Sequence, residues 1–243
     1  MTVSDWDEFA GRWASLHGGV DPRRGRGAFR AWVRGLYSIA RVLARARVKP
    51  GTVTGAGVVL SLLAPAFAAL QGYWPLAAAA AVLLAAVADG LDGAVAVVTD
   101  RVTRLGYVYD SVADRIGEAA WLVALFLLGV PGWLVAACGA LAWLHEFTRA
   151  RAVGAGARHL AVVTLAERPM RIALAALGLF FAGLAGTARG NLAAGAATGF
   201  VAVWTLLGAV GLAQVLGAVN HTLTTQPVRV TPPPEPVREE WPM

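Results

Sequence analysis

The chain has 243 residues, of which 57% are hydrophobic and only 15% are charged. Soluble domains carry about 25% charged residues, so this composition excludes an ordinary soluble globule and indicates an integral membrane protein. The formal net charge is +6, but the basic residues flank apolar runs, which argues against nucleic acid as a partner. A single cysteine, Cys138, excludes an internal disulfide.

The N-terminal segment, residues 1–28, has a mixed composition and becomes rich in Gly and Arg toward its end. It begins with acids rather than an apolar core, so we expect a loose segment or a short helix and no cleaved signal peptide. Residues 29–48 place apolar side chains at helical spacing and arginines on another face. This pattern predicts an amphipathic juxtamembrane helix in the membrane interface, with a soluble helix packed on the body of the protein as the alternative.

Six apolar stretches are each long enough to cross a bilayer, at residues 52–71, 74–98, 105–129, 131–148, 170–187 and 191–219. Twenty of the 21 basic residues lie on one side of these spans. The positive-inside rule therefore predicts that this side, with both termini, is cytoplasmic. We predict an all-α integral membrane protein whose six transmembrane helices form one domain over residues 49–220. A disordered, proline-rich tail is expected over residues 221–243.

Four carboxylates lie within the second and third spans, where ionisable groups are costly: Asp89, Asp92, Asp110 and Asp114. The first two are three residues apart and the last two are four apart, so each pair shares one helix face. The polar turn at 99–104 reverses the chain, so both pairs can point at one site. Hard oxygen ligands favour a divalent ion such as magnesium, manganese or calcium over zinc. A structural ion-pair network is the alternative, but the nearby arginines are too few to neutralise four acids.

The spacing of these acids resembles the signature of the CDP-alcohol phosphotransferase family. The chain reads Asp89-x2-Asp92-Gly93-x2-Ala96-x9-Gly106-x3-Asp110-x3-Asp114 and matches seven of the eight fixed positions without a gap. The departure is Val97, where the family has an Arg close to its diphosphate site. Arg101 and Arg104 follow within about two turns of a helix and are the candidates to replace it.

The resemblance implies a metal-dependent membrane phosphatidyltransferase of phospholipid biosynthesis, which uses CDP-diacylglycerol, releases CMP and commonly forms homodimers. It implies that Mg²⁺ or Mn²⁺ is held by Asp89, Asp92, Asp110 and Asp114, with Asp114 also acting as the general base. Residues 49–54 are similar to the Pro-Asn-x-x-Thr element that precedes the first span in the family. The implied nucleotide contacts are Thr54, Asp89, Gly93, Ala96 and Gly106.

A basic cluster lies between the fourth and fifth spans and contains Arg149-Ala-Arg151-Ala and Glu167-Arg-Pro-Met-Arg171. Positive-inside topology explains part of it, whereas the functional interpretation is an anion pocket that faces the acids, because Arg suits phosphate geometry. Family members that use inositol phosphate have a similar pair of motifs, which implies Arg149 and Arg171 as contacts to the acceptor phosphate. Glu118 extends the stripe of acids by one turn, either as a supporting residue or as a partner of Arg115 or Arg149.

Three functions remain open from the sequence. The first is a phosphatidyltransferase whose acceptor is a phosphorylated polyol, either inositol phosphate or glycerol phosphate. The second is a cardiolipin-type synthase that uses phosphatidylglycerol as its acceptor. The third is a catalytically impaired homologue or an ion-binding membrane protein, which Val97 suggests.

Overall fold

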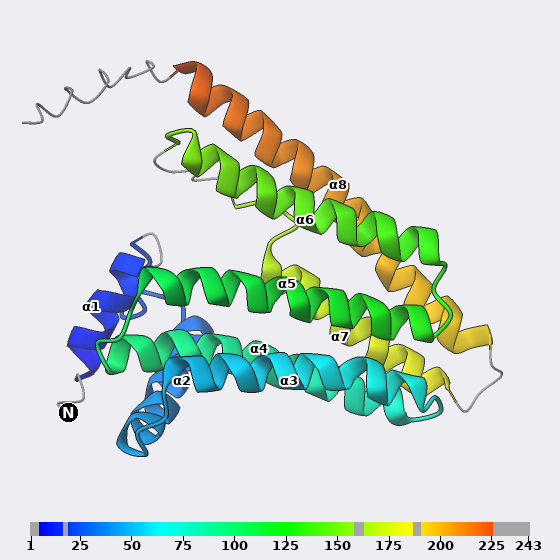
Figure 1. Cartoon of the computed structure of the whole chain (residues 1–243), viewed down its shortest axis with the longest axis horizontal. Helices are drawn as coiled ribbons and strands as arrows, with labels where there is room; N and C mark the ends of the chain where they lie inside the picture. Colours follow the sequence, from blue (N-terminus) through cyan, green and yellow to red (C-terminus); the bar gives the residue numbers. More distant parts are fainter. Residues whose placement is uncertain (1–4, 17–18, 158–162, 187–190, 226–243) are drawn as a thin grey trace, which may run out of the picture.

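The computed structural model describes residues 5–16, 19–157, 163–186 and 191–225. These residues form eight helices and no strand, which confirms the all-α prediction (Figure 1). The helices are α1 (Trp6–Leu16), α2 (Gly27–Arg45), α3 (Pro50–Ala69), α4 (Trp74–Val98), α5 (Arg104–Leu127), α6 (Gly132–Gly154), α7 (Arg168–Ala185) and α8 (Asn191–Thr225).

Four of the helices, α3, α4, α7 and α8, are long and apolar enough to cross a membrane. They coincide with four of the six predicted spans, and α5 and α6 occupy the other two ranges as helices. These two helices are less apolar, because α5 carries five charged residues and α6 carries three. The last helix, α8, continues through Thr225 into the range predicted as a tail. The remainder of that range, 226–243, lies outside the described residues.

The long helices pack in two groups (Figure 1). In one group α3 packs against α4 and α5, and in the other α8 packs against α6 and α7, while α7 also contacts α4 and joins the groups. The core between them contains many small side chains, among them Ala64, Ala78, Ala124, Ala175 and Ala182, each with no exposed surface. Small residues let helix backbones approach closely, which is how membrane helices associate.

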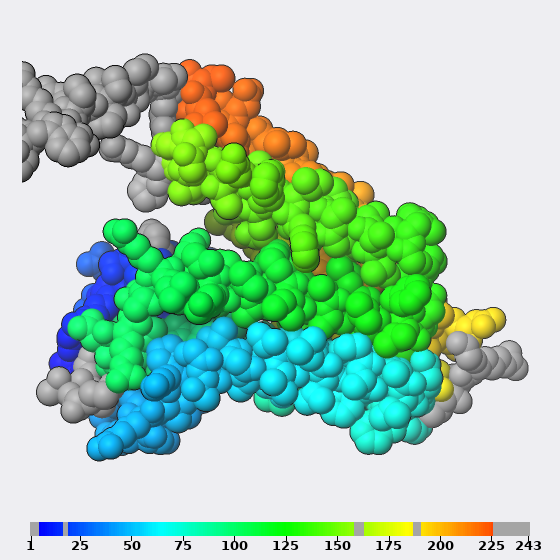
Figure 2. Space-filling model, in the orientation of Figure 1, coloured from blue at the N-terminus to red at the C-terminus, as the bar shows by residue number. Residues whose placement is uncertain are grey.

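α5 and α6 diverge toward the start of α5 and the end of α6 (Figure 1). Figure 2 shows the resulting hollow between them on the surface of the molecule. The hollow is lined by residues of both helices, including Asp114, Glu146 and Arg149. One of the four acids predicted from the sequence, Asp114, therefore lies at a surface opening.

α1 and α2 lie at the same end of the molecule as the turn between α4 and α5 (Figure 1). α2 is a helix over most of the range predicted for the amphipathic juxtamembrane helix, and it begins two residues and ends three residues earlier than expected. Its buried face packs against α4, and the buried side chains Phe9 and Trp13 of α1 join Val97 and Val98 of α4 in one apolar cluster. The short helix expected within the N-terminal segment is therefore α1.

The turn between α4 and α5 is defined by hydrogen bonds at both helix ends. Asp100 has a left-handed backbone with φ of 54°, and the backbone N–H of Arg101 donates to the carbonyl of Ala96 over 2.8 Å. These features form a Schellman-type end to α4. The hydroxyl of Thr103 then accepts a hydrogen bond from the N–H of Gly106 over 3.0 Å and caps α5. The turn brings the acid-bearing halves of α4 and α5 together.

Candidate active site

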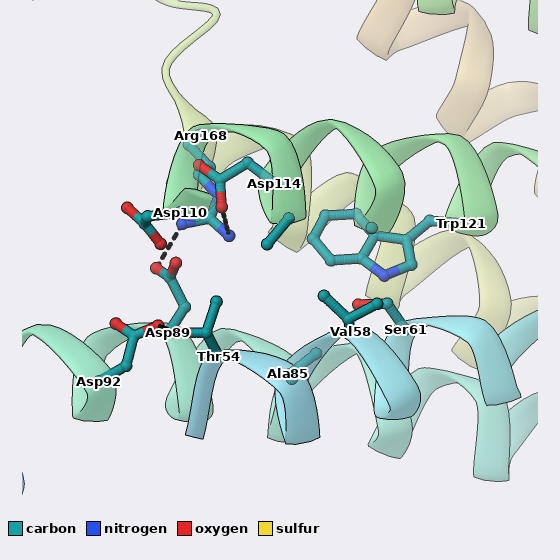
Figure 3. A pocket seen from close by; sticks show the side chains of 13 residues that line it. Thr54, Val58, Ser61, Ala85, Asp89, Asp92, Asp110, Asp114, Trp121 and Arg168 are labelled. Atoms are coloured by element: carbon teal, nitrogen blue, oxygen red, sulfur yellow. Dashed lines mark hydrogen bonds and ion pairs between the residues drawn. The ribbon is translucent and has the colours of Figure 1, made fainter. Parts of the chain in front are cut away.

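Three acids from two helices converge on one point. Asp89 and Asp92 of α4 and Asp110 of α5 offer carboxylate oxygens that all lie within 4.8 Å of one another. Figure 3 shows the carboxylate of Asp110 directed toward that of Asp89, with Asp92 and Thr54 next to them. The predicted antiparallel arrangement therefore brings three of the four acids together.

The cluster has the properties that a divalent metal ion requires. One oxygen of Asp110, Oδ1, is buried and has no hydrogen-bond partner within the described parts of the chain. Asp92 is only 7% exposed, and one of its oxygens accepts a 2.6 Å hydrogen bond from the hydroxyl of Thr54. Buried carboxylates without a cation are costly. A set of three carboxylates is also the hard donor set that Mg²⁺ and Mn²⁺ prefer, so these residues fit such an ion.

Asp114 lies one turn after Asp110 but makes a different contact. Its carboxylate forms an ion pair with Arg168 over 2.5 Å, and Arg168 also pairs with Asp89 (Figure 3). Arg168 is the first residue of α7, and its guanidinium reaches into the small pocket that the four acids line. Asp114 is thus the one predicted metal ligand outside the three-acid cluster, and Arg168 is a site residue that we did not predict.

The predicted nucleotide contacts line one cavity between α3, α4 and α5. Thr54, Gly93, Ala96 and Gly106 all face it, together with Asp92 and Asp110 of the acid cluster. Asp89 lines the small adjoining pocket instead. The cavity is therefore lined both by two of the three clustered acids and by residues of the turn between α4 and α5, such as Arg101 and Thr103.

The two arginines predicted to contact the acceptor phosphate have different surroundings. Arg149 lines the hollow between α5 and α6, where its guanidinium forms an ion pair with Glu167 over 2.5 Å. Arg171 is 1% exposed, and all three of its side-chain nitrogens have protein partners. These partners are the carbonyl of Ala166 and the carboxylates of Glu118 and Glu146. This placement differs from the direct phosphate contact that we predicted for Arg171.

Glu118 is a partner in a buried charge network. It has no exposed surface and pairs with Arg171 and, over 2.8 Å, with Arg115, one of the two partners that the sequence left open. The network connects α5, α6 and α7, because Arg171 also contacts Glu146 of α6. Charges buried in this way are held in place by one another, so the network fixes the start of α7 beside the acids.

Comparison with known proteins assigns the family. The model of the CDP-alcohol phosphatidyltransferases matches residues 47–222, which include α3 to α7 and most of α8. The chain belongs to this family. It is accordingly an enzyme, a phosphatidyltransferase of phospholipid biosynthesis, and a membrane protein.

Two relatives of this phosphatidyltransferase are named as synthases of inositol lipids. The phosphatidylinositol phosphate synthase of Cutibacterium acnes is 34% identical over 164 residues, which cover 65% of this chain and 78% of the relative. The archaetidylinositol phosphate synthase of Pyrococcus horikoshii is 31% identical over 147 residues, which cover 60% of this chain and 77% of the relative.

Solved structures of a further phosphatidyltransferase share the fold. The phosphatidylinositol phosphate synthase PgsA1 of Mycobacterium tuberculosis with CDP-DAG bound has a TM-score of 0.63 at 24% identity, with 82% of this chain and 98% of that chain covered. The same protein in complex with manganese and citrate has a TM-score of 0.65 at 23% identity, with 81% and 92% covered. At these identities the comparison establishes the fold.

Val97, at which this phosphatidyltransferase departs from the family motif, has a structural role. Val97 is 2% exposed and packs in the apolar cluster that holds α1. Of the two arginines considered as replacements, Arg101 lines the cavity with the nucleotide contacts, whereas Arg104 is not among its lining residues.

Proposed function

We propose that the protein transfers the phosphatidyl group of CDP-diacylglycerol to a hydroxyl of inositol phosphate and releases CMP. The observation that carries the proposal is the convergence of three carboxylates within 4.8 Å beside a cavity lined by the motif residues. The names of both relatives and the CDP-DAG bound to PgsA1 support the donor and the acceptor class. Glycerol phosphate is the other phosphorylated polyol that the same chemistry would accept.

Asp89, Asp92 and Asp110 would hold Mg²⁺ or Mn²⁺, and the manganese in the PgsA1 structure supports this choice. Bound there, the ion would neutralise charge on the diphosphate as the bond to CMP breaks. The motif names Asp114 as a fourth ligand. Asp114 would bind the ion only after its ion pair with Arg168 is broken. We propose that Thr54, Gly93, Ala96 and Gly106 shape the nucleotide end of the cavity.

Asp114 is the proposed general base. The acceptor hydroxyl oxygen forms a bond to the phosphorus on the lipid side of the diphosphate, the bond from that phosphorus to the CMP oxygen breaks, and the hydroxyl proton passes to Asp114. A carboxylate within hydrogen-bond reach of the hydroxyl can accept this proton as the bond forms. Asp114 lines the pocket of the other acids and also the hollow between α5 and α6, so it can face donor and acceptor together.

The acceptor would enter through the hollow between α5 and α6. Arg149 and Arg115 both line this hollow together with Asp114, and arginines bind phosphate through parallel hydrogen bonds. We propose that Arg149 contacts the acceptor phosphate. Arg171 would act by holding Glu118 and Glu146 in place.

We also propose that α5 and α6 cross the membrane, giving six spans in all. The acids of α5 are at least partly buried, whereas Val108, Val112 and Val123, about half exposed, present an apolar surface outward. α2 exposes Trp32 and Val42 as well as arginines, which suits the membrane interface. Basic residues lie near the end of the molecule that holds α1, α2 and the turn between α4 and α5, which supports a cytoplasmic active site and cytoplasmic termini. By resemblance to the family, we expect a homodimer.

The test is a panel of acceptors with the purified protein, CDP-diacylglycerol and Mg²⁺. Inositol phosphate, glycerol phosphate and phosphatidylglycerol are supplied separately, and CMP and the mass of the lipid product are measured. We expect CMP release with the inositol phosphate product. A product formed only with phosphatidylglycerol would identify a cardiolipin-type synthase, and no CMP with any acceptor would indicate a catalytically impaired homologue.

A further inference from the structure

The cavity between α3, α4 and α5 is lined by side chains of both charges. Asp92 and Asp110 are its acids, and Lys49 and Arg101 are the basic residues among the described residues that line it. Gly51, Gly55 and Gly93 also line the cavity, and a Cβ atom on each would meet no other atom within 4 Å. The cavity can therefore take an anionic ligand whose phosphates contact a metal at the acids and the basic side chains that line the same space.

Arg101 is placed at this cavity by the way α4 ends. Its backbone N–H is bonded to the carbonyl of Ala96, one turn after Asp92, and the left-handed Asp100 makes the turn that permits this bond. The backbone of Arg101 is thus fixed at the end of the helix that carries two of the acids. Arg101 itself is exposed, so its guanidinium is free of the desolvation that burial imposes.

The neighbouring Asp100 is held by α1. The guanidinium of Arg12 donates a 2.7 Å hydrogen bond to the Asp100 carboxylate, and α1 is kept in place because Phe9 and Trp13 are buried in the apolar cluster that α4 and α2 share. Without Arg12, Asp100 would be an adjacent partner for Arg101 and would repel a phosphate. α1 lies outside the residues that the family model matches, so this contact is an addition to the family domain.

We propose that Arg101 and Lys49, which line the same cavity, bind the diphosphate of the CDP-lipid, and that Arg12 positions Arg101 by holding Asp100. The proposal rests on the proposed function for its ligand. A guanidinium can donate two parallel hydrogen bonds to a phosphate, and Arg101 supplies the positive charge that Val97 does not. Val97 lines the same cavity and belongs to the apolar cluster that includes the helix carrying Arg12.

The first experiment compares Arg101→Ala with Arg104→Ala, a neighbouring exposed arginine that does not line the cavity. Binding of CDP in the presence of Mg²⁺ is measured by calorimetry, and the KM for CDP-diacylglycerol is measured with inositol phosphate. A charge-assisted hydrogen bond to phosphate corresponds to roughly 10- to 100-fold in affinity. We expect Arg101→Ala to weaken CDP binding and raise KM by this factor with kcat little changed, and Arg104→Ala to behave as wild type. Equal CDP binding by both variants would overturn the role of Arg101.

The second experiment tests whether Arg12 acts through Asp100. Arg12→Ala should raise the KM for CDP-diacylglycerol, and adding Asp100→Asn to it should restore KM, because Asn removes the competing charge and tolerates the left-handed backbone. If the double variant stays as impaired as Arg12→Ala, Arg12 serves only to dock α1 and its positioning role is lost.

Failure of this inference differs from failure of the proposed function. A wild-type protein that releases CMP but binds CDP no better than Arg101→Ala would refute the inference alone. A wild-type protein that releases no CMP with any acceptor would refute the proposed function, and the CDP titrations would still report whether Arg101 binds a nucleoside diphosphate.

Discussion

The hydroxyl of Thr54 donates a 2.6 Å hydrogen bond to the carboxylate of Asp92, and this contact joins α3 to the acid cluster on α4. The bond occupies one oxygen of Asp92 and fixes the direction of the other. Residues that orient metal ligands are typically worth about 10- to 100-fold in metal affinity or activity. We expect Thr54→Val to raise the Mn²⁺ concentration for half-maximal activity by that factor, measured by metal titration of CMP release.

Thr54→Ser is the control, because it keeps the hydroxyl and should retain wild-type metal dependence. Thr54 also lines the nucleotide cavity, so CDP-diacylglycerol is kept saturating during the titration. Identical metal curves for Thr54→Val and wild type would show that the hydrogen bond does not orient Asp92 in the working enzyme.

Asp110→Asn and Asp114→Asn should separate metal binding from proton transfer. Asp110 belongs to the three-acid cluster and Asp114 does not, so Asp110→Asn should weaken Mn²⁺ binding, measured by calorimetry, more than Asp114→Asn. Asp114→Asn should still bind CDP but lose turnover by about 10²- to 10⁴-fold, the usual contribution of a general base. Normal turnover by Asp114→Asn would remove this residue from the base role.

Removal of divalent metal should lower both activity and stability. Chelation leaves the carboxylates of Asp89, Asp92 and Asp110 in close contact without the ion. A bound ligand at 100 times its Kd stabilises a folded protein by about 2.7 kcal/mol, and removal of the metal loses this stabilisation. We expect EDTA to abolish CMP release and lower the unfolding temperature in detergent, with both restored by Mn²⁺. In the Asp110→Asn variant the same treatment should shift the unfolding temperature much less.

The sequence allowed prediction of the acid cluster because helical spacing and one reversing turn are local properties. Asp89 and Asp92 share a face whatever surrounds them, and Asp110 follows on the next helix. The partners of the arginines could not be predicted in the same way. Whether Arg168 or Arg171 reaches the acids depends on how α7 is rotated against α4 and α5, which the motif Glu167-Arg-Pro does not encode. The docking of α1 on Val97 is likewise a tertiary contact.

Arg171 should matter for stability more than for binding. Its side chain is 1% exposed and lies between Glu118 and Glu146, so Arg171→Met leaves Glu146 without its arginine and Glu118 with Arg115 alone. Breaking a buried pair by removing one partner costs about 3–5 kcal/mol. We expect a large fall in unfolding temperature for Arg171→Met and a small one for Arg151→Met, whose arginine is exposed. Adding Glu146→Gln to Arg171→Met should recover part of the loss, because Arg171 is the arginine paired with Glu146. A stable Arg171→Met protein would contradict the network.

Gly211 of α8 should be required for the position of the segment that precedes α7. A Cβ at Gly211 would lie 2.3 Å from the Cβ of Ala166, whose carbonyl accepts the hydrogen bond from Arg171. Gly211→Ala must therefore displace Ala166, and with it the start of α7 and Arg168. Such overpacking costs about 1–3 kcal/mol. We expect lower stability and lower turnover.

Gly217→Ala on the same helix is the matched control for Gly211→Ala, because a Cβ at Gly217 would meet no atom within 4 Å. In a helix, Ala is favoured over Gly by about 1 kcal/mol when nothing else changes, so Gly217→Ala should be neutral or stabilising. The two variants make the same chemical change with opposite expected signs in unfolding temperature. Equal stabilisation of both would mean that α8 and Ala166 are not in contact in the folded protein, and the support for Arg168 would then have to come from the buried charge network alone.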